Sequence, residues 1–379
     1  MNKRILHKND ENNHYRASKK FKTQKFKPIV SKFNFLEHYS KQFKDSDNLL
    51  SLQKEIFRKK FVRLNILNDI SNKISNNILK TDSNTNLNKE EEELVQLFKK
   101  AYRTTLKETN IPHCYEIEKS HFSLSGSFPI MSGRAYLQDY PSQIPLYCID
   151  YYQFSNQNSL KIIDMCSSPG SKLTQLSNVL IEQIQRGILK KNCQIEIISN
   201  EISKARFSRL LNNVQKQFSS EFPVTITFIQ LDALQLGRIK EFEEYFDIVF
   251  LDAPCSGNFL QERNWFNKRD KKGVLRNSQI QKQLLEVAKK VCTKTGVIVY
   301  STCSMEVEEN EENVIYAQKN LNLESVALEE NFYKSFSYPI RSIEILKNIE
   351  NKKLIQDSIR IHPPYSKTQA FFVSVFNKK

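Results

Sequence analysis

The sequence lacks a long apolar run. No stretch of its 379 residues approaches the roughly 18 apolar residues that a membrane-spanning helix needs. The chain also does not open with the charged and then apolar pattern of a secretion signal. We therefore expect no membrane partner, and we expect a reducing intracellular compartment in which cysteines remain free thiols.

The sequence also lacks paired cysteine motifs. It contains seven cysteines, at positions 114, 148, 166, 193, 255, 292 and 303, and none of them forms a C-x-x-C pair. Such pairs nucleate most structural zinc sites and many redox sites, so no metal is expected here. Thiolate chemistry at single cysteines remains open.

Acidic residues are fewer than basic ones. Lysine and arginine number 57 against 42 aspartates and glutamates, which gives a formal net charge of +15. Such an excess attracts polyanions in a salt-dependent manner, so RNA or DNA is an expected partner. A biased base composition in the gene would produce the same excess, and charge alone does not separate the two explanations.

Three segments differ in composition. Residues 1–30 are rich in lysine and poor in apolar residues, which predicts a basic disordered arm. Residues 31–155 contain short helical patterns and predict a smaller helical or mixed domain that binds RNA, with an exposed loop at 76–88. One such helical pattern comprises Leu94, Leu97, Phe98, Ala101, Tyr102 and Leu106.

Residues 156–379 alternate apolar strands with amphipathic helices. Strands are predicted at residues 160–165, 195–198, 224–229, 246–251, 297–300 and 370–376, with helices between them. This alternation is typical of an α/β domain in which a mostly parallel sheet is covered by helices on both faces.

Ligands of such sheets bind at the carboxyl ends of the strands, and the residues there are unusual. The first strand runs into DMCSSPGSK (164–172), a turn of small residues that opens a helix and lacks both Walker and G-x-G-x-x-G spacing. Glu201 follows the second strand, where nucleoside sites hold ribose hydroxyls, and Asp232 follows the third, within reach of an adenine amino group. Each acid alone is more often a cap, but together they predict a nucleoside pocket.

Two cysteines follow the next two strands. Cys255 lies in DAPCSG after residues 246–251, and Cys303 lies in YSTCS after residues 297–300. A single buried cysteine is usually an inert small apolar residue. Two cysteines beside Asp252 at a ligand-binding edge favour a chemical role instead.

These motifs resemble those of the RNA 5-methylcytosine methyltransferases of the NOL/NOP/Sun (RsmB/NOP) family. The matching segments are DMCSSPGSKLTQL (164–176), NEISKARFSRLLNN (200–213), LDAPCSG (251–257), YSTCSMEVEENEENV (300–314), RIHPPYSKTQAFFVSVF (360–376) and, upstream, GRAYLQD (133–139). The resemblance covers the chain from about residue 33 to its end. It implies a class I S-adenosylmethionine-dependent methyltransferase fold, Rossmann-like, with a mostly parallel seven-stranded sheet at residues 156–379.

The resemblance also implies a donor site and a catalytic set. The S-adenosylmethionine site would comprise Cys166, Ser167, Ser168, Pro169, Gly170, Ser171, Lys172, Glu201, Arg206, Asp232 and Asp252. Cys303 matches the nucleophile, and Cys255 matches the second cysteine, which helps to complete the reaction. A thiolate that adds to carbon 6 of cytosine makes carbon 5 nucleophilic, Lys172 and the cationic donor favour that thiolate, and Asp252 can hydrogen-bond the ring.

The substrate is less well defined by the sequence. FLEHYSKQF (35–43) and RKKFVRLN (58–65) are most similar to family members that modify tRNA, and the target base must leave its stack to react. The alternatives are rRNA, a catalytically idle RNA-binding ribosome-assembly factor, and a methyltransferase for DNA or protein. We expect a monomer, by family analogy, in the nucleus or nucleolus or else in the cytoplasm.

Overall fold

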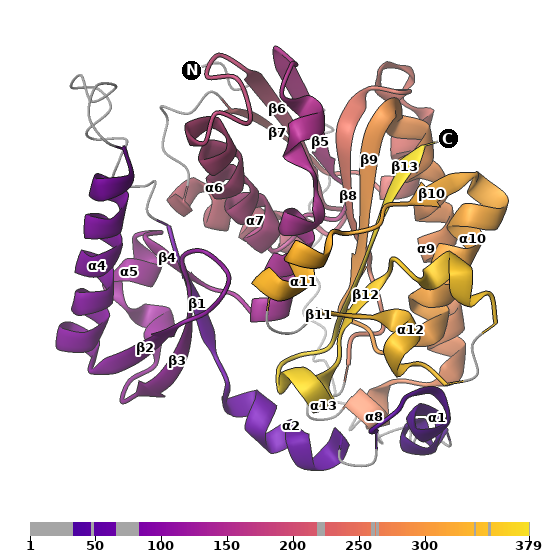
Figure 1. Ribbon diagram of the computed structural model, residues 1–379, viewed down its shortest axis with the longest axis horizontal. Helices are drawn as coiled ribbons and strands as arrows, with labels where there is room; N and C mark the ends of the chain where they lie inside the picture. Colours follow the sequence, from indigo (N-terminus) through magenta and orange to yellow (C-terminus); the bar gives the residue numbers. More distant parts are fainter. Residues whose placement is uncertain are drawn as a thin grey trace, which may run out of the picture.

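The computed structural model describes residues 33–46, 49–65, 83–217, 224–258, 262, 265–336, 339–347 and 350–378. The basic arm predicted at residues 1–30 and part of the predicted loop, residues 76–82, lie outside the described residues. The described chain forms a large unit around one long sheet and a smaller unit around a second sheet (Figure 1). No described helix combines the length and the apolar character needed to cross a bilayer.

The large sheet has nine strands instead of the seven expected, and it is mixed. Its order is β11-β12-β13-β9-β8-β5-β6-β7, and β10 pairs with β13. The five strands from β7 to β9 are parallel, whereas every pairing that involves β10, β11, β12 or β13 is antiparallel. The strands are β5 (Ser159–Asp164), β6 (Gln194–Asn200), β7 (Val224–Ile229), β8 (Phe246–Asp252), β9 (Cys292–Thr302), β10 (Leu323–Ser325), β11 (Pro339–Arg341), β12 (Ile359–Ile361) and β13 (Phe371–Lys378). All six predicted strands are present.

Helices cover both faces of this sheet, as predicted (Figure 1). The principal ones are α6 (Ser171–Gln185), α7 (Lys204–Gln217), α9 (Lys271–Val291) and α10 (Glu311–Leu321). Alternate residues of the central strands enter two separate apolar clusters: Ile162 packs with α6 and α7, and Ile163 packs with α9 and α10. Because both faces are buried, the parallel strands read as continuous apolar runs in the sequence.

The smaller unit is a mixed α/β arrangement. Its antiparallel sheet has the order β2-β3-β1-β4, formed by β1 (Phe61–Leu64), β2 (Thr104–Glu108), β3 (Cys114–Ser120) and β4 (Ala135–Leu137), and it packs against α4 (Ser83–Tyr102). Two predictions were wrong here. Leu106 lies in β2 instead of a helix, because Arg103 adopts a left-handed conformation (φ 46°) that ends α4 and the next two residues are β-branched threonines. Residues 83–88, predicted as loop, begin α4, whose apolar face is supported by the sheet.

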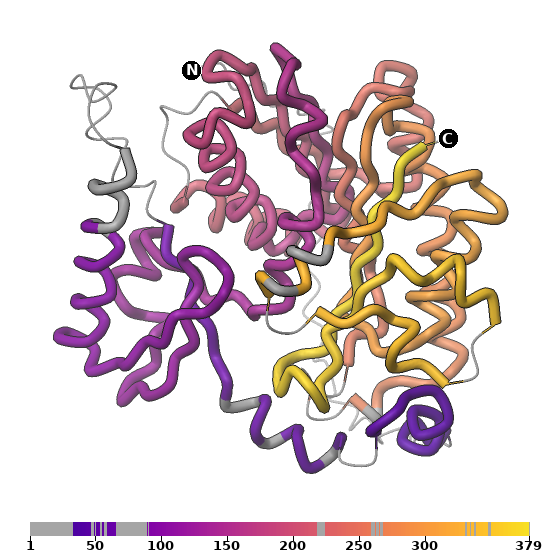
Figure 2. The backbone as a smooth tube through the Cα atoms, in the orientation of Figure 1, coloured from indigo at the N-terminus to yellow at the C-terminus, as the bar shows by residue number. Residues whose placement is uncertain are grey.

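The first helices pack on the large unit although they precede the smaller one in sequence. Phe35, Tyr39 and Phe43 of α1 (Phe35–Gln42) belong to the same apolar cluster as α9 and α10, and α2 (Leu49–Arg58) contributes Ile56. Figure 2 shows the indigo trace of α1 beside orange and yellow segments from the other end of the chain. The division at residue 155 stays a prediction.

The remaining helices are short. They are α5 (Phe128–Met131), α8 (Trp265–Lys268), α11 (Glu330–Ser335), α12 (Ser342–Ile345), α13 (Pro363–Ser366) and the 3-10 helices η1 (Leu124–Gly126), η2 (Tyr140–Cys148), η3 (Tyr151–Phe154), η4 (Ala233–Arg238), η5 (Lys240–Phe242), η6 (Val307–Glu309) and η7 (Lys352–Ile355). Several of them lie next to strand ends and shape the site described below.

Arg63 joins the two units. This residue of β1 is 1% exposed, and its guanidinium donates hydrogen bonds to Gln138 Oε1 (3.0 Å), Thr174 Oγ1 (2.9 Å) and Gln217 Oε1 (3.1 Å). Thr174 and Gln217 lie on α6 and α7 of the large unit. Burial lowers the pKa of Arg63 to about 10, so the side chain is buried as a cation that depends on these three acceptors.

We predict that Arg63→Ala lowers the free energy of unfolding by about 3 kcal/mol, because it leaves three buried acceptors without their donor. Urea denaturation measures the change. Arg209→Ala, on the exposed face of α7, is the matched control and should change stability by less than about 0.5 kcal/mol. An equal loss in both variants would contradict the bridging role of Arg63.

Candidate active site

A cavity of about 580 Å³ opens at the carboxyl ends of β5, β6, β8 and β9. This is the edge at which parallel α/β sheets bind ligands. Ten of the thirteen predicted site residues line it: Cys166, Ser168, Pro169, Ser171, Lys172, Glu201, Arg206, Asp252, Cys255 and Cys303. Ser167, Gly170 and Asp232 do not, although all three are next to residues that do.

The turn after β5 is held in a fixed shape. Gly170 starts α6 with φ 94°, and a Cβ atom there would lie 2.9 Å from a methyl group of Leu210, so both the turn and the packing on α7 require glycine. Ser168 Oγ donates to the carbonyl of Arg206 (3.0 Å), and the Arg206 guanidinium donates to the carbonyl of Ser168 (2.8 Å). These bonds join the turn to the start of α7 on the wall of the cavity.

The acids after β6 and β7 differ in what they contact. Glu201 lines the cavity at 2% exposure, where it accepts a hydrogen bond from the backbone of Ser203 (2.8 Å) and pairs with Arg206 (3.4 Å). Asp232 instead accepts a hydrogen bond from the backbone N–H of Leu234 (3.0 Å) and caps η4. Its carboxylate therefore has the capping role that is common for such acids, and its neighbour Ala233 lines the cavity.

An ion pair crosses the cavity. Lys172 Nζ lies 2.6 Å from Asp252 Oδ2, and Asp252 Oδ1 accepts a hydrogen bond from Ser301 Oγ (2.8 Å). The Asp252 side chain is 33% exposed, so part of its carboxylate faces the open space. Lys172 is thus held by Asp252 directly.

The two predicted cysteines meet in this cavity. Cys255 Sγ and Cys303 Sγ are 3.4 Å apart, within hydrogen-bond distance for sulfur. The hydrogen bond to Cys303, burial and the charge of Glu309 raise the pKa of Cys255 well above that of a free thiol. The two sulfurs are therefore close enough to share one proton, and either thiol can be the donor of this hydrogen bond.

The sequence interpretation gave no role to several cavity residues. Tyr136, Leu137, Gln138 and Asp139, from β4 and the turn after it, form a wall contributed by the smaller unit. Burial raises the pKa of Asp139, against the opposing charges of Lys60 and Lys172. The GRAYLQD match contained these residues, but no strand alternation placed them near the sheet edge. The large unit adds Ile202, Pro254 and Phe371 as apolar residues of the cavity lining.

Trp265 and His362 have structural roles. Trp265 is fully buried, packs edge-on against Phe35 (4.6 Å between ring centres) and donates to the carbonyl of Ser256 (2.8 Å). His362 is buried between the rings of Phe43 and Tyr365, and burial together with Arg360 lowers its pKa to about 3. His362 is therefore neutral at physiological pH. Arg263 lies outside the described residues.

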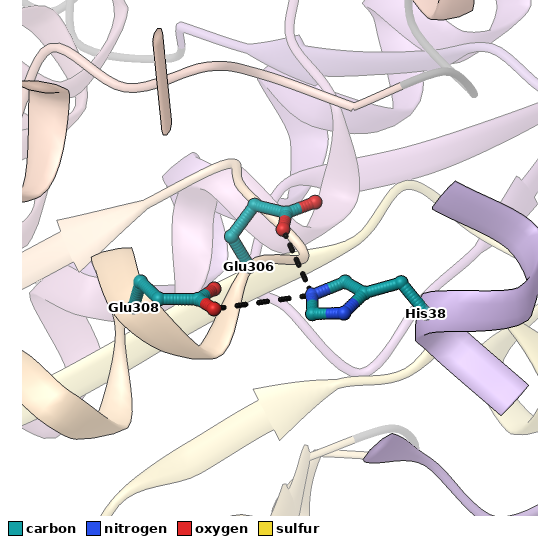
Figure 3. Close-up of side chains that lie close together, drawn as sticks. All are labelled: His38, Glu306 and Glu308. Carbon is teal, nitrogen blue, oxygen red and sulfur yellow. Dashed lines mark ion pairs between the residues drawn. The ribbon is translucent and has the colours of Figure 1, made fainter. Parts of the chain in front are cut away.

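A second group of ionisable side chains lies behind the Cys303 turn (Figure 3). His38 of α1, Glu306 and Glu308 place potential ligand atoms within 4.8 Å of one another. Lys271 Nζ is already in contact with Glu308 and lies 3.1 Å from His38 Nε2 and 3.9 Å from Glu306 Oε2. The ammonium group of Lys271 thus supplies the positive charge next to the two carboxylates. These four side chains form an ion-pair network that joins α1 to the segment after Cys303.

The described fold is that of the class I, S-adenosylmethionine-dependent methyltransferases. The solved structure of NSun6 from Pyrococcus horikoshii with SFG superposes with a TM-score of 0.64 at 17% identity, over 93% of this chain and 99% of that one. A methyltransferase homolog protein from the same organism superposes with a TM-score of 0.61 at 19% identity, over 91% of this chain and 94% of that one.

The chain belongs to the RsmB/F family. The family profile described as 16S rRNA methyltransferase RsmB/F matches residues 152–377, which confirms the resemblance to the NOL/NOP/Sun methyltransferases. A tRNA (cytosine(49)-C(5))-methyltransferase of Pyrococcus abyssi is 31% identical over 228 residues, and a human 28S rRNA (cytosine(4447)-C(5))-methyltransferase is 28% identical over 255 residues. These matches cover 57% and 65% of this chain, but only 63% of the archaeal relative and 28% of the human one.

Asp164, at the end of β5, provides a test of the electrostatics under the cavity. Burial, with a contribution from Asp252, raises the pKa of Asp164 from 3.8 to about 6. A carboxyl group whose pKa rises on folding adds stability below its unfolded pKa, and this stability is lost as the pH increases through the folded pKa. The folded protein thus carries an energetic penalty at neutral pH that it does not carry at pH 4.

We predict that Asp164→Asn, which cannot ionise, becomes more stable relative to the wild type as the pH rises from 4 to 7. The gain over this range is on the order of 3 kcal/mol. Urea denaturation of both proteins at several pH values measures it. A stability difference that does not change with pH would show that Asp164 is not buried as described.

Proposed function

We propose that this protein is an S-adenosylmethionine-dependent RNA (cytosine-5) methyltransferase that works through a covalent bond between Cys303 and carbon 6 of the target cytosine. One observation carries the proposal: two sulfur atoms 3.4 Å apart share a cavity with Asp252 and the turn after β5. A nucleophile, a proton-transfer group and a ring-binding carboxylate thereby face one space.

The cavity suits an adenosyl donor. Its volume is within the range of small-molecule sites, the buried carboxylate of Glu201 is available for ribose hydroxyls, and the turn at residues 166–172 presents backbone groups at the start of α6. Ile202 adds an exposed apolar side chain on the same wall. When bound, S-adenosylmethionine supplies a methyl group attached to a positively charged sulfur.

Cys303 starts the reaction by bonding to carbon 6 of a cytosine that has left its stack. The electron pair of the carbon 5–carbon 6 double bond moves into the ring, and carbon 5 becomes able to accept a methyl group. Ring nitrogen 3 takes up a proton from solvent as the thiolate adds, and Asp252 accepts hydrogen bonds from this N–H and from the amino group. Lys172 and Ser301 hold the Asp252 carboxylate in place (2.6 and 2.8 Å).

Cys255 serves the second half of the reaction. Its pKa is raised mainly by the hydrogen bond to Cys303, and this cause is removed once the sulfur of Cys303 is bonded to the base. Cys255 then loses its proton more readily, and its thiolate takes the proton from carbon 5. The ring double bond re-forms, the bond between sulfur and carbon 6 breaks, and Cys303 is released as a thiolate.

We favour tRNA as the substrate. The archaeal relative is named for cytosine 49 of tRNA, and the segments at residues 35–43 and 58–65 resemble tRNA-modifying members. Ribosomal RNA is the second candidate, because the family profile and the human relative are named for it. An idle RNA-binding factor fits less well, since it has no chemical need for Cys255, Cys303 and Asp252 in one cavity. The monomeric state and a nuclear or nucleolar location stay predictions.

An acceptor assay tests the reaction. Purified protein is incubated with total RNA and S-adenosylmethionine that carries tritium in its methyl group, and we expect label in 5-methylcytosine of nuclease-sensitive material. Separate tRNA and rRNA fractions then identify the substrate, with the higher rate expected for tRNA. Label in protein or DNA, or no label in any fraction, would rule out RNA methylation.

An adduct assay tests the roles of the cysteines. Cys255→Ala should accumulate a protein–RNA adduct that survives denaturing electrophoresis, because the step that releases Cys303 is blocked. Cys303→Ala should form no adduct and show no turnover. Cys193→Ala, a buried cysteine outside the cavity, is the control and should behave like the wild type. The opposite pattern in the first two variants would exchange their roles.

A further inference from the structure

A buried carboxylate lies between the two cysteine turns without lining the cavity. Glu309 ends η6, is 0% exposed and accepts hydrogen bonds from the backbone N–H of Ser256 at both oxygens (3.0 and 3.2 Å). Ser256 Oγ donates to the same carboxylate (2.7 Å). The group therefore binds the residue that immediately follows Cys255.

The same carboxylate reaches the Cys303 turn. Ser304 immediately follows Cys303, its hydroxyl lies 3.2 Å from Ser256 Oγ, and it stabilises the ionised form of Glu309, which lowers the pKa of that carboxyl. A further bond, from Asn258 Nδ2 to the carbonyl of Cys303 (2.7 Å), closes the loop between the two turns. One acid thus fixes both residues that neighbour the reactive sulfurs.

The chemistry of Glu309 argues for a role beyond packing. Burying a carboxylate is costly, and the partners that the described residues give it are hydroxyl and amide groups instead of a cation. Burial raises its pKa, while hydrogen bonds from Ser304, Ser256 and Asn277 stabilise the ionised form. Its negative charge is among the causes that raise the pKa of Cys255.

We infer, on the basis of the proposed function, that Glu309 is a positioning residue for the two active-site cysteines: its carboxylate holds the turns of Cys255 and Cys303 at the separation at which the sulfurs share a proton. Glu309 touches neither substrate nor donor and acts through Ser256 and Ser304. Its charge also favours the protonated form of Cys255, so that the nucleophile is Cys303 and not its neighbour.

The test measures thiol reactivity in the free, full-length protein. Iodoacetamide is applied between pH 7 and 10, and alkylation of each cysteine is followed by peptide mass spectrometry. Glu309→Gln keeps the shape and removes the charge, so the pKa of Cys255 should fall and Cys255 should react about tenfold faster at a given pH. Glu308→Gln, on the same turn but directed to Lys271, should leave the rate within about twofold of the wild type.

Two further measurements distinguish a loss of cysteine positioning from a general destabilisation of the protein. Cys193 and Cys292 are buried outside the cavity and should keep their low reactivity in Glu309→Gln. In the methylation assay, kcat should fall about 100-fold, as expected for misplaced reacting groups, while the KM for RNA stays within about twofold. Increased reactivity of all buried cysteines would overturn the inference, and so would wild-type reactivity and kcat.

A second variant tests the same inference if Glu309→Gln does not fold. Ser256→Ala removes the hydroxyl donor to Glu309 but keeps the backbone donor and the charge of the carboxylate. It should therefore lower kcat by a smaller factor and leave alkylation of Cys255 within about twofold of the wild type. A wild-type kcat in Ser256→Ala would overturn the inference where Glu309→Gln is insoluble. If the wild type methylates no RNA, the proposed function fails, whereas a selective change at Cys255 in Glu309→Gln still supports the positioning of the thiols.

Discussion

The contact between the sulfurs of Cys255 and Cys303 depends on the pairing of two neighbouring parallel strands. In the register of β8 and β9, Asp252 lies opposite Ser301, so the next few residues of both strands leave the sheet at the same level. A register shifted by one residue would turn each side chain to the opposite face and separate the carboxylate from its serine. The ion pair between Lys172 and Asp252 depends on this register. So do the position of the turn after β5 and the contacts of the Glu309 carboxylate.

Local sequence patterns predicted the half of the site that follows the parallel strands. Apolar runs revealed β5, β6, β7, β8 and β9, and the rule that ligands bind at strand ends then brought Glu201, Asp252, Cys255 and Cys303 together. The same rule predicted Asp232 as a pocket residue; its carboxylate caps η4, its neighbour Ala233 lines the cavity, and its part in ligand binding stays a prediction. A capping acid and a ligand-binding acid have the same appearance in a sequence, because the difference depends on the φ and ψ angles of the following residues.

Other features required contacts between distant segments. The wall formed by Tyr136 and Asp139 comes from the smaller unit, and no periodic pattern relates β4 to the edge of the large sheet. The short antiparallel strands β10, β11 and β12 have three residues each, too few for an alternation to be detected, so the apolar runs indicated six of the nine strands. The expectation of seven strands came from the family resemblance. Glu309 lies in a run of acids that resembles a solvated helix start, and only the structure shows its carboxylate between Ser256 and Ser304.

The packing of α1 on segments near the C-terminal end of the chain affects how this protein folds during its synthesis. Phe43 pairs with Leu346, and the Tyr39 hydroxyl binds Glu306 across 267 positions, so the first helix docks on a surface that does not exist until most of the polypeptide has been synthesised. At the usual speed of translation, roughly 300 further residues take on the order of 15 to 60 s. During that interval the apolar face of the helix is exposed on the ribosome, where molecular chaperones bind such segments. A stalled or truncated nascent chain would therefore present a ready signal for degradation.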